Sequence, residues 1–188
     1  GLMKILVQAE AFYLGAEVNA MRHGRTDIGA IASFVGLARD MNEGSGVQAM
    51  TLEHYPGMTE KALAALVDEA NTRWALLDVT VIHRVGRLLP GDPIVLVAVA
   101  SSHRGEAFAA CEFIMDALKT RAPFWKKEET PEGERWVDAR SSDDTADICR
   151  AMGVRFTITP DFPGFGPQKN RALDLASGDW VISIDADE

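Results

Sequence analysis

The sequence predicts a mixed α+β domain over residues 1–140, followed by a shorter segment of α/β character over residues 141–188. Short apolar runs typical of strands recur through the first 140 residues, and two long stretches among them carry apolar residues at helical spacing. Beyond residue 140, short helical and strand-like patterns alternate, as in one half of a Rossmann-like unit. We therefore expect one complete domain and one partial one.

The predicted strands of the first domain are apolar or alternate apolar with polar residues. They cover residues 3–9, 29–38, 46–55, 78–88, 93–101, 124–129 and 134–139. The run at 93–101 is almost wholly apolar, which indicates a central strand. The last two strands flank residues 130–133, a hairpin turn. We expect the strands to pair mostly with their neighbours in the sequence.

Two long helices are predicted in the same domain. Thr59 is placed to cap the first helix, which runs to Trp74, and Ser102 is placed to cap the second. The second helix runs to about Ala122, because Pro123 restricts the residue before it. A weaker helical pattern precedes His23. In the second segment we expect helices at 143–152 and 168–177 and strands at 154–159 and 180–185.

The composition excludes several classes of protein. The chain of 188 residues has 19 Lys and Arg against 28 Asp and Glu, a net charge of −9, which argues against coating nucleic acid or an anionic membrane. Cys111 and Cys149 form no CxxC pair, so neither a disulfide scaffold nor a cysteine-rich zinc site is expected. No apolar run reaches the ~20 residues of a membrane span and no signal peptide opens the chain, so the cytoplasm is the expected location.

One short stretch reverses the acidic character of the chain. Residues 119–127 contain no acid and hold the cations Lys119, Arg121, Lys126 and Lys127. Such a run is often only a solvated surface. Pro123, Phe124 and Trp125 interrupt it, however, and apolar residues beside cations also fit the wall of an anion-binding pocket.

The long helices and their flanks carry a family resemblance. The stretches TLEHYPGMTEKAL (51–63), VIHRVGRLLPGD (81–92), SSHRGEAF (101–108), IMDALKTRAPFWKKE (114–128) and GERWVDAR (133–140) resemble the large, catalytic subunit of molybdopterin synthase. The resemblance implies an α/β-hammerhead fold and a central homodimer within a heterotetramer. It also implies a sulfurtransferase that converts cyclic pyranopterin monophosphate into molybdopterin. The partner is a small ubiquitin-like subunit, whose thiocarboxylated C-terminus donates the sulfur.

The resemblance also implies roles for individual residues. Lys119 and Lys126 are the essential lysines, and Lys119 is expected to be partly buried as a proton shuttle or nucleophile. The implied substrate-binding residues are Phe34, Leu37, Ala38, Arg39, His103, Arg104, Met115, Lys127 and Glu128. His103 and Arg104 belong to the helix start, where free N–H groups favour a phosphate, and would reach the site of the other protomer.

Without the resemblance, several of these residues have ordinary interpretations. Phe34 and Met115 would be core residues, His103 a capping or surface histidine, and Arg39 a loop charge. The four histidines show no i, i+4 pairing and no acid completes a ligand set, so no metal and no cofactor are expected.

The second segment resembles a different family. SSDDTADICRAMGVRF (141–156) and PGFGPQKNRALDLASGDWVISIDADE (163–188) are similar to family 2 glycosyltransferases, and Asp185 and Asp187 match a DxD motif. That family's first strand and everything after the motif have no counterpart here. We therefore expect this segment to be non-catalytic and the motif to be vestigial.

Three functions remain open on the sequence. The leading one is sulfur transfer to a pyranopterin. The second is a module that binds the small subunit without turnover, and the third is a nucleotide-sugar-dependent glycosyltransferase. Pull-down with the small subunit, beside a turnover assay, separates the first two.

Overall fold

The computed structural model describes residues 2–39, 46, 48–138 and 174. In order along the chain, the elements are β1 (Leu2–Gln8), α1 (Leu14–Arg22), β2 (Ala30–Leu37), β3 (Ala49–His54), α2 (Met58–Arg73), β4 (Leu76–Arg84), β5 (Gly86–Leu88), β6 (Pro93–Ser101), α3 (Arg104–Arg121), β7 (Phe124–Thr130) and β8 (Gly133–Asp138). The four elements predicted within residues 143–185 lie outside the described residues except for Asp174, which is helical and falls within the predicted helix 168–177.

The larger sheet has the strand order β1-β4-β6-β2. β1 runs parallel to β4, and the β4–β6 and β6–β2 pairs are antiparallel. β6 is an interior strand, as its apolar sequence predicted. Because side chains alternate between the faces of a sheet, Val95, Val97 and Val99 lie in one core cluster and Leu96 and Ala98 in another.

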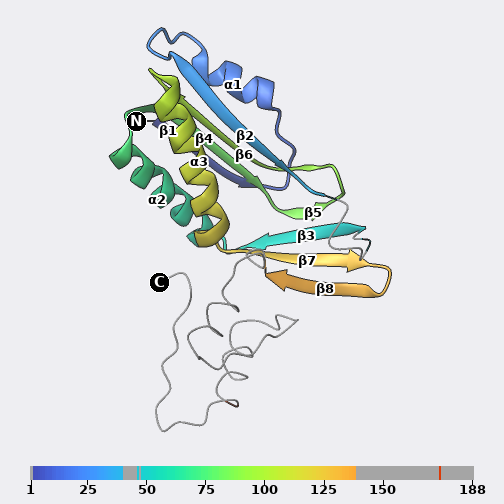
Figure 1. The fold of residues 1–188 in the computed structure, drawn as a ribbon. Helices are drawn as coiled ribbons and strands as arrows, with labels where there is room; N and C mark the ends of the chain where they lie inside the picture. The colour runs from blue at the N-terminus through green and yellow to red at the C-terminus, as the bar shows by residue number, and fades with distance from the viewer. Residues whose placement is uncertain (1, 40–45, 47, 139–173, 175–188) are drawn as a thin grey trace.

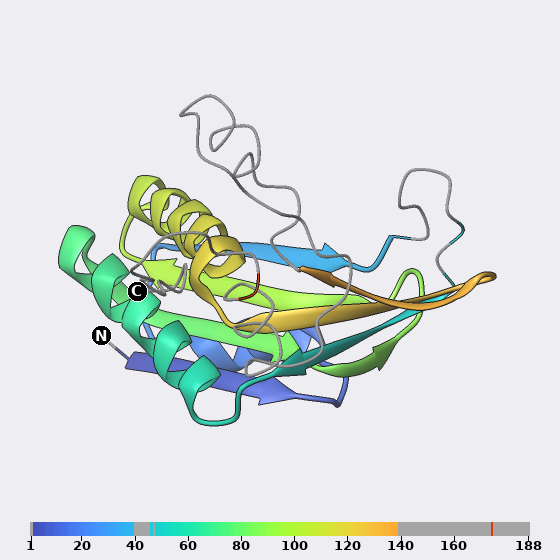
Figure 2. The same ribbon diagram turned by 90° about the horizontal axis from the view of Figure 1, so that it is seen from below.

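Helices cover both faces of this sheet. α2 and α3 lie side by side on one face, where Leu63, Val67 and Ile114 belong to the core cluster of Val97. Figures 1 and 2 both show the two helices together along the sheet. α1 contributes Met21 to the cluster on the opposite face. The weak helical pattern before His23 is therefore a real helix, and the mixed α+β class is confirmed.

The smaller sheet has the order β5-β3-β7-β8, and all of its pairs are antiparallel. Among the strands described in this sheet, β7 and β8 follow one another directly in the sequence. Three of the pairs, β3–β5, β4–β6 and β7–β8, join strands predicted as neighbours along the sequence. The pairs β1–β4, β2–β6 and β3–β7 join distant strands, so the expectation that strands pair mostly with their neighbours holds only in part. Local turn residues identify a hairpin, whereas long-range pairing depends on which apolar faces must be buried together.

The predicted strand at 78–88 is divided between the two sheets. β4 ends at Arg84 in the larger sheet and β5 begins at Gly86 in the smaller one. Gly86 has φ +86°, a conformation that side-chain-bearing residues rarely adopt, and this redirects the chain. The sequence analysis missed the break between β4 and β5, because β-forming residues continue across it and a single glycine marks it.

Both predicted helix caps were wrong by one or two residues. Gly57 is the N-cap of α2, and its N–H donates to Glu60 Oε2 at 2.6 Å. Thr59 lies inside the helix and uses its hydroxyl for other partners. His103, rather than Ser102, is the N-cap of α3. Hydroxyl side chains near a helix start have several competing backbone partners, so the sequence alone does not fix the cap.

Candidate active site

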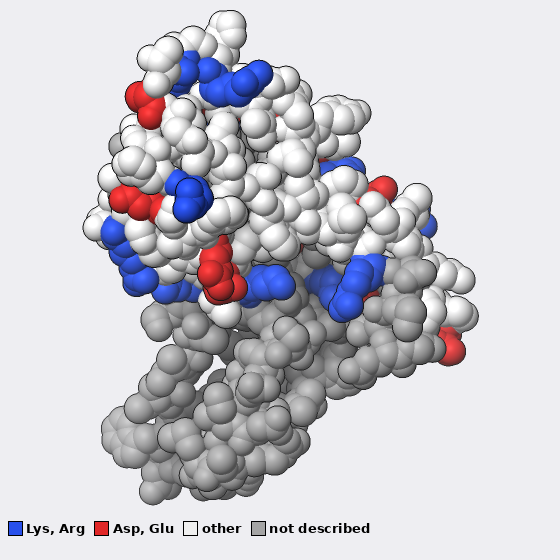
Figure 3. Space-filling view, turned by 45° about the horizontal axis from the view of Figure 1, so that its top comes forward, with Lys and Arg blue, Asp and Glu red and all other residues white. Residues whose placement is uncertain are grey.

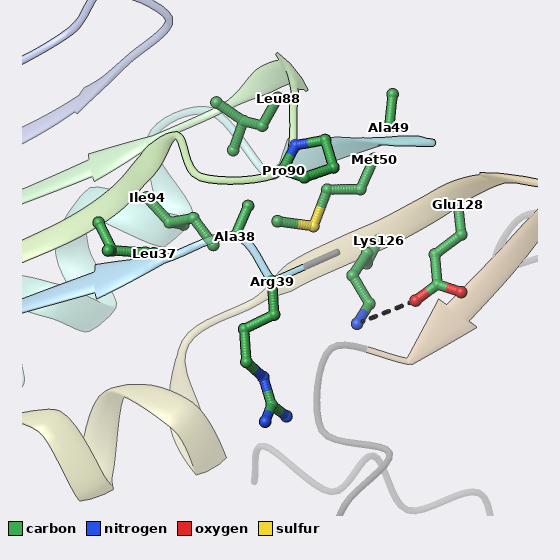
Figure 4. Close-up of a pocket in the computed structure, with 10 residues that line it drawn as sticks. All are labelled: Leu37, Ala38, Arg39, Ala49, Met50, Leu88, Pro90, Ile94, Lys126 and Glu128. Carbon is green, nitrogen blue, oxygen red and sulfur yellow. Dashed lines mark ion pairs between the residues drawn. The ribbon is translucent and has the colours of Figure 1, made fainter. Parts of the chain in front are cut away.

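A pocket of about 200 Å³ opens where the end of β2 meets the smaller sheet. Figure 4 shows its walls, with the Arg39 and Lys126 side chains extending toward the same side. The lining residues are Leu37, Ala38, Arg39, Ala49, Met50, Leu88, Pro90, Ile94, Lys126 and Glu128. Five of these, Leu37, Ala38, Arg39, Lys126 and Glu128, are among the site residues implied by the sequence. The pocket thus combines an apolar wall with two cations and one carboxylate.

Backbone geometry places Arg39 at this pocket. The β2–β6 register shifts between Gly36 and Leu37, as in a β-bulge. A Cβ on Gly36 would lie 2.8 Å from Val95 Cγ1, so a larger residue there would force the Val95 side chain or the strand to shift. Beyond the bulge, the Ala38 N–H donates to the Asp92 carbonyl at 2.8 Å. These contacts fix the strand end that carries Arg39.

The turn after β5 holds the other side of that strand end. The Leu89 N–H donates to Asp92 Oδ2 at 2.8 Å, and the Gly91 N–H donates to the Ala38 carbonyl at 2.6 Å. Gly91 has φ +90°, which a glycine adopts without strain. The sequence predicted this turn at residues 90–92, but not its hydrogen bonds to the backbone of Ala38.

Strand alternation separates the two adjacent lysines of β7. Lys126 and Glu128 line the pocket, and Lys126 Nζ lies 3.3 Å from Glu128 Oε1. The Glu128 side chain is only 3% exposed, so this carboxylate is held inside the pocket wall. Lys127 projects from the other face of the strand, where its Nζ lies 3.5 Å from Glu134 Oε2. Lys127 is not among the residues that line the pocket.

Five lining residues were missed by the sequence analysis. Met50 lies opposite Glu128 in the β3–β7 register, and Ala49 lies opposite Glu129. Leu88, Pro90 and Ile94 come from β5, the following turn and β6. Their types carry no chemical signal, since small and apolar residues occur throughout the core. Only the pairing of β3 with β5 and β7 would have revealed them.

Lys119 occupies the last turn of α3, just before the chain enters β7. Its side chain is exposed in the single chain, so the expected partial burial is not seen there and stays a prediction for the assembled site. A lysine four residues after the buried Met115 lies near the edge of the buried stripe rather than inside it. Lys119 and Lys126 flank the same short connection between α3 and β7.

The pocket therefore brings a guanidinium and an ammonium to one apolar wall, with a third cation on the adjoining helix end. Figure 3 shows Lys and Arg side chains gathered along the lower border of the described surface in that view. Such an arrangement suits a substrate that is both anionic and partly apolar.

The family model described as "MoaE protein" matches residues 7–121. The chain belongs to the MoaE family. The molybdopterin synthase catalytic subunit of Ralstonia nicotianae is 68% identical over 142 residues, covering 76% of this chain and 81% of that protein. The comparison supports the prediction of a molybdopterin synthase catalytic subunit, a sulfurtransferase, over the binding-module and glycosyltransferase alternatives.

Solved structures agree with this assignment. A molybdopterin biosynthesis MoaE protein from Burkholderia ambifaria is 59% identical with a TM-score of 0.67, covering 82% of this chain and all of that chain. A complex of subunits 1 and 2 of molybdopterin-converting factor from Helicobacter pylori has a TM-score of 0.60. It covers 74% of this chain and 92% of that chain at 19% identity, so it supports the fold alone.

Two of the residues implied for the MoaE-family site lie far from the pocket within one chain. His103 caps the start of α3 and Arg104 is its first residue, whereas Lys119 is in its last turn. At 1.5 Å per residue, roughly 22 Å of helix separates Arg104 from Lys119. One protomer therefore does not bring these residues together. Both side chains are exposed, so a second protomer has access to them.

Phe34 and Met115 also lie outside the set of residues that line the pocket. Met115 is buried in the main core, on the face of α3 that packs on the larger sheet. Phe34 lies on β2, at the edge of that sheet, and is 41% exposed. An exposed aromatic residue on an edge strand is a candidate contact surface. The roles implied for both residues stay predictions.

Two buried residues that can titrate, Cys111 and His83, have shifted pKa values that do not suit a catalytic role near neutral pH. Burial raises the pKa of the Cys111 thiol to about 11, so it is not a nucleophile. Burial also lowers the pKa of His83 to about 4, and its ring stacks on Phe124 with centroids 3.7 Å apart. His83 is therefore a neutral structural residue at neutral pH.

The described residues contain no group of three or more His, Cys, Asp or Glu side chains that could hold a metal ion. Asp185 and Asp187, the DxD-like pair, lie outside the described residues. None of the helices in the described part of the chain is long and apolar enough to span a membrane.

Proposed function

We propose that the pocket between the end of β2 and the smaller sheet is where sulfur passes from a thiocarboxylated donor to cyclic pyranopterin monophosphate, forming the dithiolene of molybdopterin. The single observation that carries this proposal is that Arg39 and Lys126 line one pocket with an apolar wall. The phosphate of the substrate and the thiocarboxylate of the donor are both anions. Two cations concentrate both reactants and stabilise charge that develops between them.

Lys126 is the lysine of the pocket itself, and the buried Glu128 carboxylate fixes its ammonium group at 3.3 Å. An ammonium held in one place acts as a preorganised electrostatic donor, which is worth more than a mobile surface charge. Arg39, which follows the end of β2, presents the planar donors that suit a phosphate. Leu37 and Ala38 supply the apolar surface beside it, and Lys127 would contact substrate only from outside the described pocket.

Lys119 completes the catalytic pair. Its place in the last turn of α3, just before the connection that leads to Lys126, supports a role for this second lysine at the same site. We assign it contact with the terminal carboxyl group of the donor and a role as proton shuttle or nucleophile. Because Lys119 is exposed in a single chain, the bound donor tail would supply the burial that this role requires.

The remaining substrate contacts come from assembly. His103 and Arg104 would reach the pocket of a second protomer and bind the phosphate, with Phe34 and Met115 beside the pterin. The exposure of His103, Arg104 and Phe34 supports this arrangement, since none of the three is committed to the core of its own chain. A homodimer with two complete sites follows, each site combining residues of both protomers.

The donor is a small ubiquitin-like subunit, which makes the whole assembly a heterotetramer. The Ralstonia nicotianae relative is named as the catalytic subunit of molybdopterin synthase, which supports a further subunit as the partner of this chain. The cytoplasm is the proposed location, as the sequence led us to expect.

The test is turnover with purified thiocarboxylated small subunit and the pyranopterin substrate. Lys119→Ala is expected to abolish molybdopterin formation while the variant still binds the small subunit in a pull-down. Lys61→Ala, which removes an exposed lysine from the outer surface of α2, is the matched control and should turn over normally. Undiminished product from Lys119→Ala would contradict the assigned role.

We also propose a boundary near residue 140, with residues 1–140 as the catalytic domain in an α/β-hammerhead fold. Residues 141–188 would be a truncated segment related to family 2 glycosyltransferases. A version ending at Arg140 should match the turnover of the full chain. A faster short version would show that the segment obstructs the site. A shift in melting temperature with a nucleotide sugar and a divalent metal would contradict the non-catalytic assignment.

A further inference from the structure

Thr59 is a fully buried polar residue in the first turn of α2, with 0% of its surface exposed. Its hydroxyl accepts a hydrogen bond from the Tyr55 N–H at 3.0 Å and donates one to the Pro123 carbonyl at 3.2 Å. One hydroxyl group thus joins two segments that are 64 residues apart in the sequence. Buried hydroxyl groups are normally hydrogen-bonded, and this one connects two separate turns.

The carbonyl that receives this bond belongs to the connection between the two proposed catalytic lysines. α3 ends at Arg121 and β7 begins at Phe124, so Pro123 lies between Lys119 and Lys126. Backbone bonds from Ala122 to Leu118 and from Phe124 to Ala122 shape this connection locally. The bond from Thr59 ties it to another element.

The other partner of Thr59 fixes the turn between β3 and α2. Tyr55 directly follows β3, and β3 pairs with β7 so that His54 lies opposite Phe124. The Thr59 N–H also donates to the Tyr55 carbonyl at 2.9 Å. The two strands and the two turns at their ends therefore form one closed unit, with the Thr59 hydroxyl at its centre.

We propose that Thr59 is a positioning residue for sulfur transfer, which sets the orientation of Lys119 relative to Lys126 through its hydrogen bond to the Pro123 carbonyl. This inference rests on the proposed function, because it requires both lysines to act at one site. Thr59 is not among the residues that line the pocket, and its effect passes through the α3–β7 connection. A small displacement of one catalytic group relative to another is costly for turnover even when binding is intact.

The substitution that isolates this role is Thr59→Val, which keeps the shape of the side chain and removes the hydroxyl. Thr59→Ser restores the hydroxyl without the methyl group. Thr59→Ala removes the hydroxyl without adding a methyl group and serves if the valine variant does not fold. Thr80→Val is the matched control, since Thr80 is 2% exposed and lies on β4 beside Ile82, at positions whose side chains face away from α2 and α3.

The experiment measures kcat and KM for thiocarboxylated small subunit, together with the melting temperature of each variant. For Thr59→Val we expect kcat to fall by about 10- to 100-fold, with KM changed by less than about threefold. Thr59→Ser should recover most of the wild-type kcat. Thr80→Val should keep the wild-type kcat even if its melting temperature falls as far as that of Thr59→Val.

Two results would overturn the inference. In the first, Thr59→Val or Thr59→Ala has the same kcat as Thr80→Val at a comparable melting temperature. The second is a Thr59→Ser variant as slow as Thr59→Val, which would show that the methyl group rather than the hydroxyl matters. A wild-type chain without turnover would instead overturn the proposed function, and the inference with it.

Discussion

The ammonium group of Lys126 lies 3.3 Å from Oε1 of Glu128, and the Glu128 side chain is 3% exposed while that of Lys126 is 26% exposed. The carboxylate is thus fixed in the wall and the lysine reaches from it into the pocket. Replacing Glu128 by Gln keeps the shape of the side chain and removes its charge. We expect Glu128→Gln to lower kcat/KM for sulfur transfer by about tenfold, because a charge-assisted hydrogen bond that orients Lys126 becomes a neutral one.

The control for this prediction is the next residue of the same strand. Glu129 Oε2 lies 3.0 Å from Arg87 Nε on the other face of β7, so Glu129→Gln also removes one carboxylate from one ion pair. Turnover assays should show Glu129→Gln close to wild type. Equal losses in the two variants would mean that the charge of the strand, and not the position of Glu128, affects the reaction.

Removing the lysine itself should have a larger effect. Lys126→Met retains most of the aliphatic stem and deletes the cation that faces the pocket. We expect a fall of about 100- to 1000-fold in kcat, as when one preorganised donor is removed from a reacting oxyanion. Single-turnover measurement of product will distinguish this loss from weaker donor binding. A change of less than about threefold would remove Lys126 from the catalytic pair.

The sequence predicted elements better than it predicted their partners. The apolar run at 93–101 and the turn at 130–133 correctly predicted β6 and the β7–β8 hairpin, because both signals are local. The break between β4 and β5 and the pairing of β3 with β7 were missed. Pairing is decided by burial of whole faces, and a single residue such as Gly86 carries little of that information.

The same distinction applies to the site. Charged residues in an unusual run drew attention to Lys119 and Lys126, and family resemblance added Arg39. The structure shows that alternation along β7 directs Lys126 and Lys127 to opposite faces. The predicted strand at 124–129 already implied this alternation. Met50 and Leu88 could not have been found, since an apolar wall is visible only when its strands are assembled.

The turn that holds Ala38 gives a stability prediction. Gly91 has φ +90°, with nothing within 4 Å of a Cβ built on it, so Gly91→Ala adds backbone strain without a clash. We expect a loss of about 1–2 kcal/mol in the free energy of unfolding, measured by urea denaturation. Because Ala38 precedes Arg39, turnover should fall beyond the loss of folded protein.

Another glycine in open space provides the comparison. Gly15 lies in the first turn of α1, and nothing lies within 4 Å of a Cβ built on it. Gly15→Ala should raise the free energy of unfolding by about 0.5–1 kcal/mol, because the helical conformation suits alanine better. If both alanine variants shifted stability in the same direction, the positive φ at Gly91 would not be the cause.

His83 gives a prediction about pH. Burial lowers its pKa from 6.5 to about 4, so the folded state resists taking up a proton that the unfolded state accepts readily below pH 6.5. The stability that neutral His83 provides is therefore complete above pH 6.5 and is lost progressively as the pH falls toward 4. Between pH 7 and pH 5, this one group should cost about 2 kcal/mol of unfolding free energy.

The measurement is urea denaturation at pH 7 and pH 5 for the wild type and for His83→Phe, which retains a ring to stack on Phe124. The variant should lose about 2 kcal/mol less than the wild type between the two pH values, whatever its stability at pH 7. His23→Gln is the control for the loss of a histidine, since His23 is exposed and lies outside the stack on Phe124. The prediction fails if His83→Phe loses as much unfolding free energy between pH 7 and pH 5 as the wild type does. That result would mean that His83 takes up a proton in the folded state at pH 5, so its ring would have to leave the buried stack on Phe124.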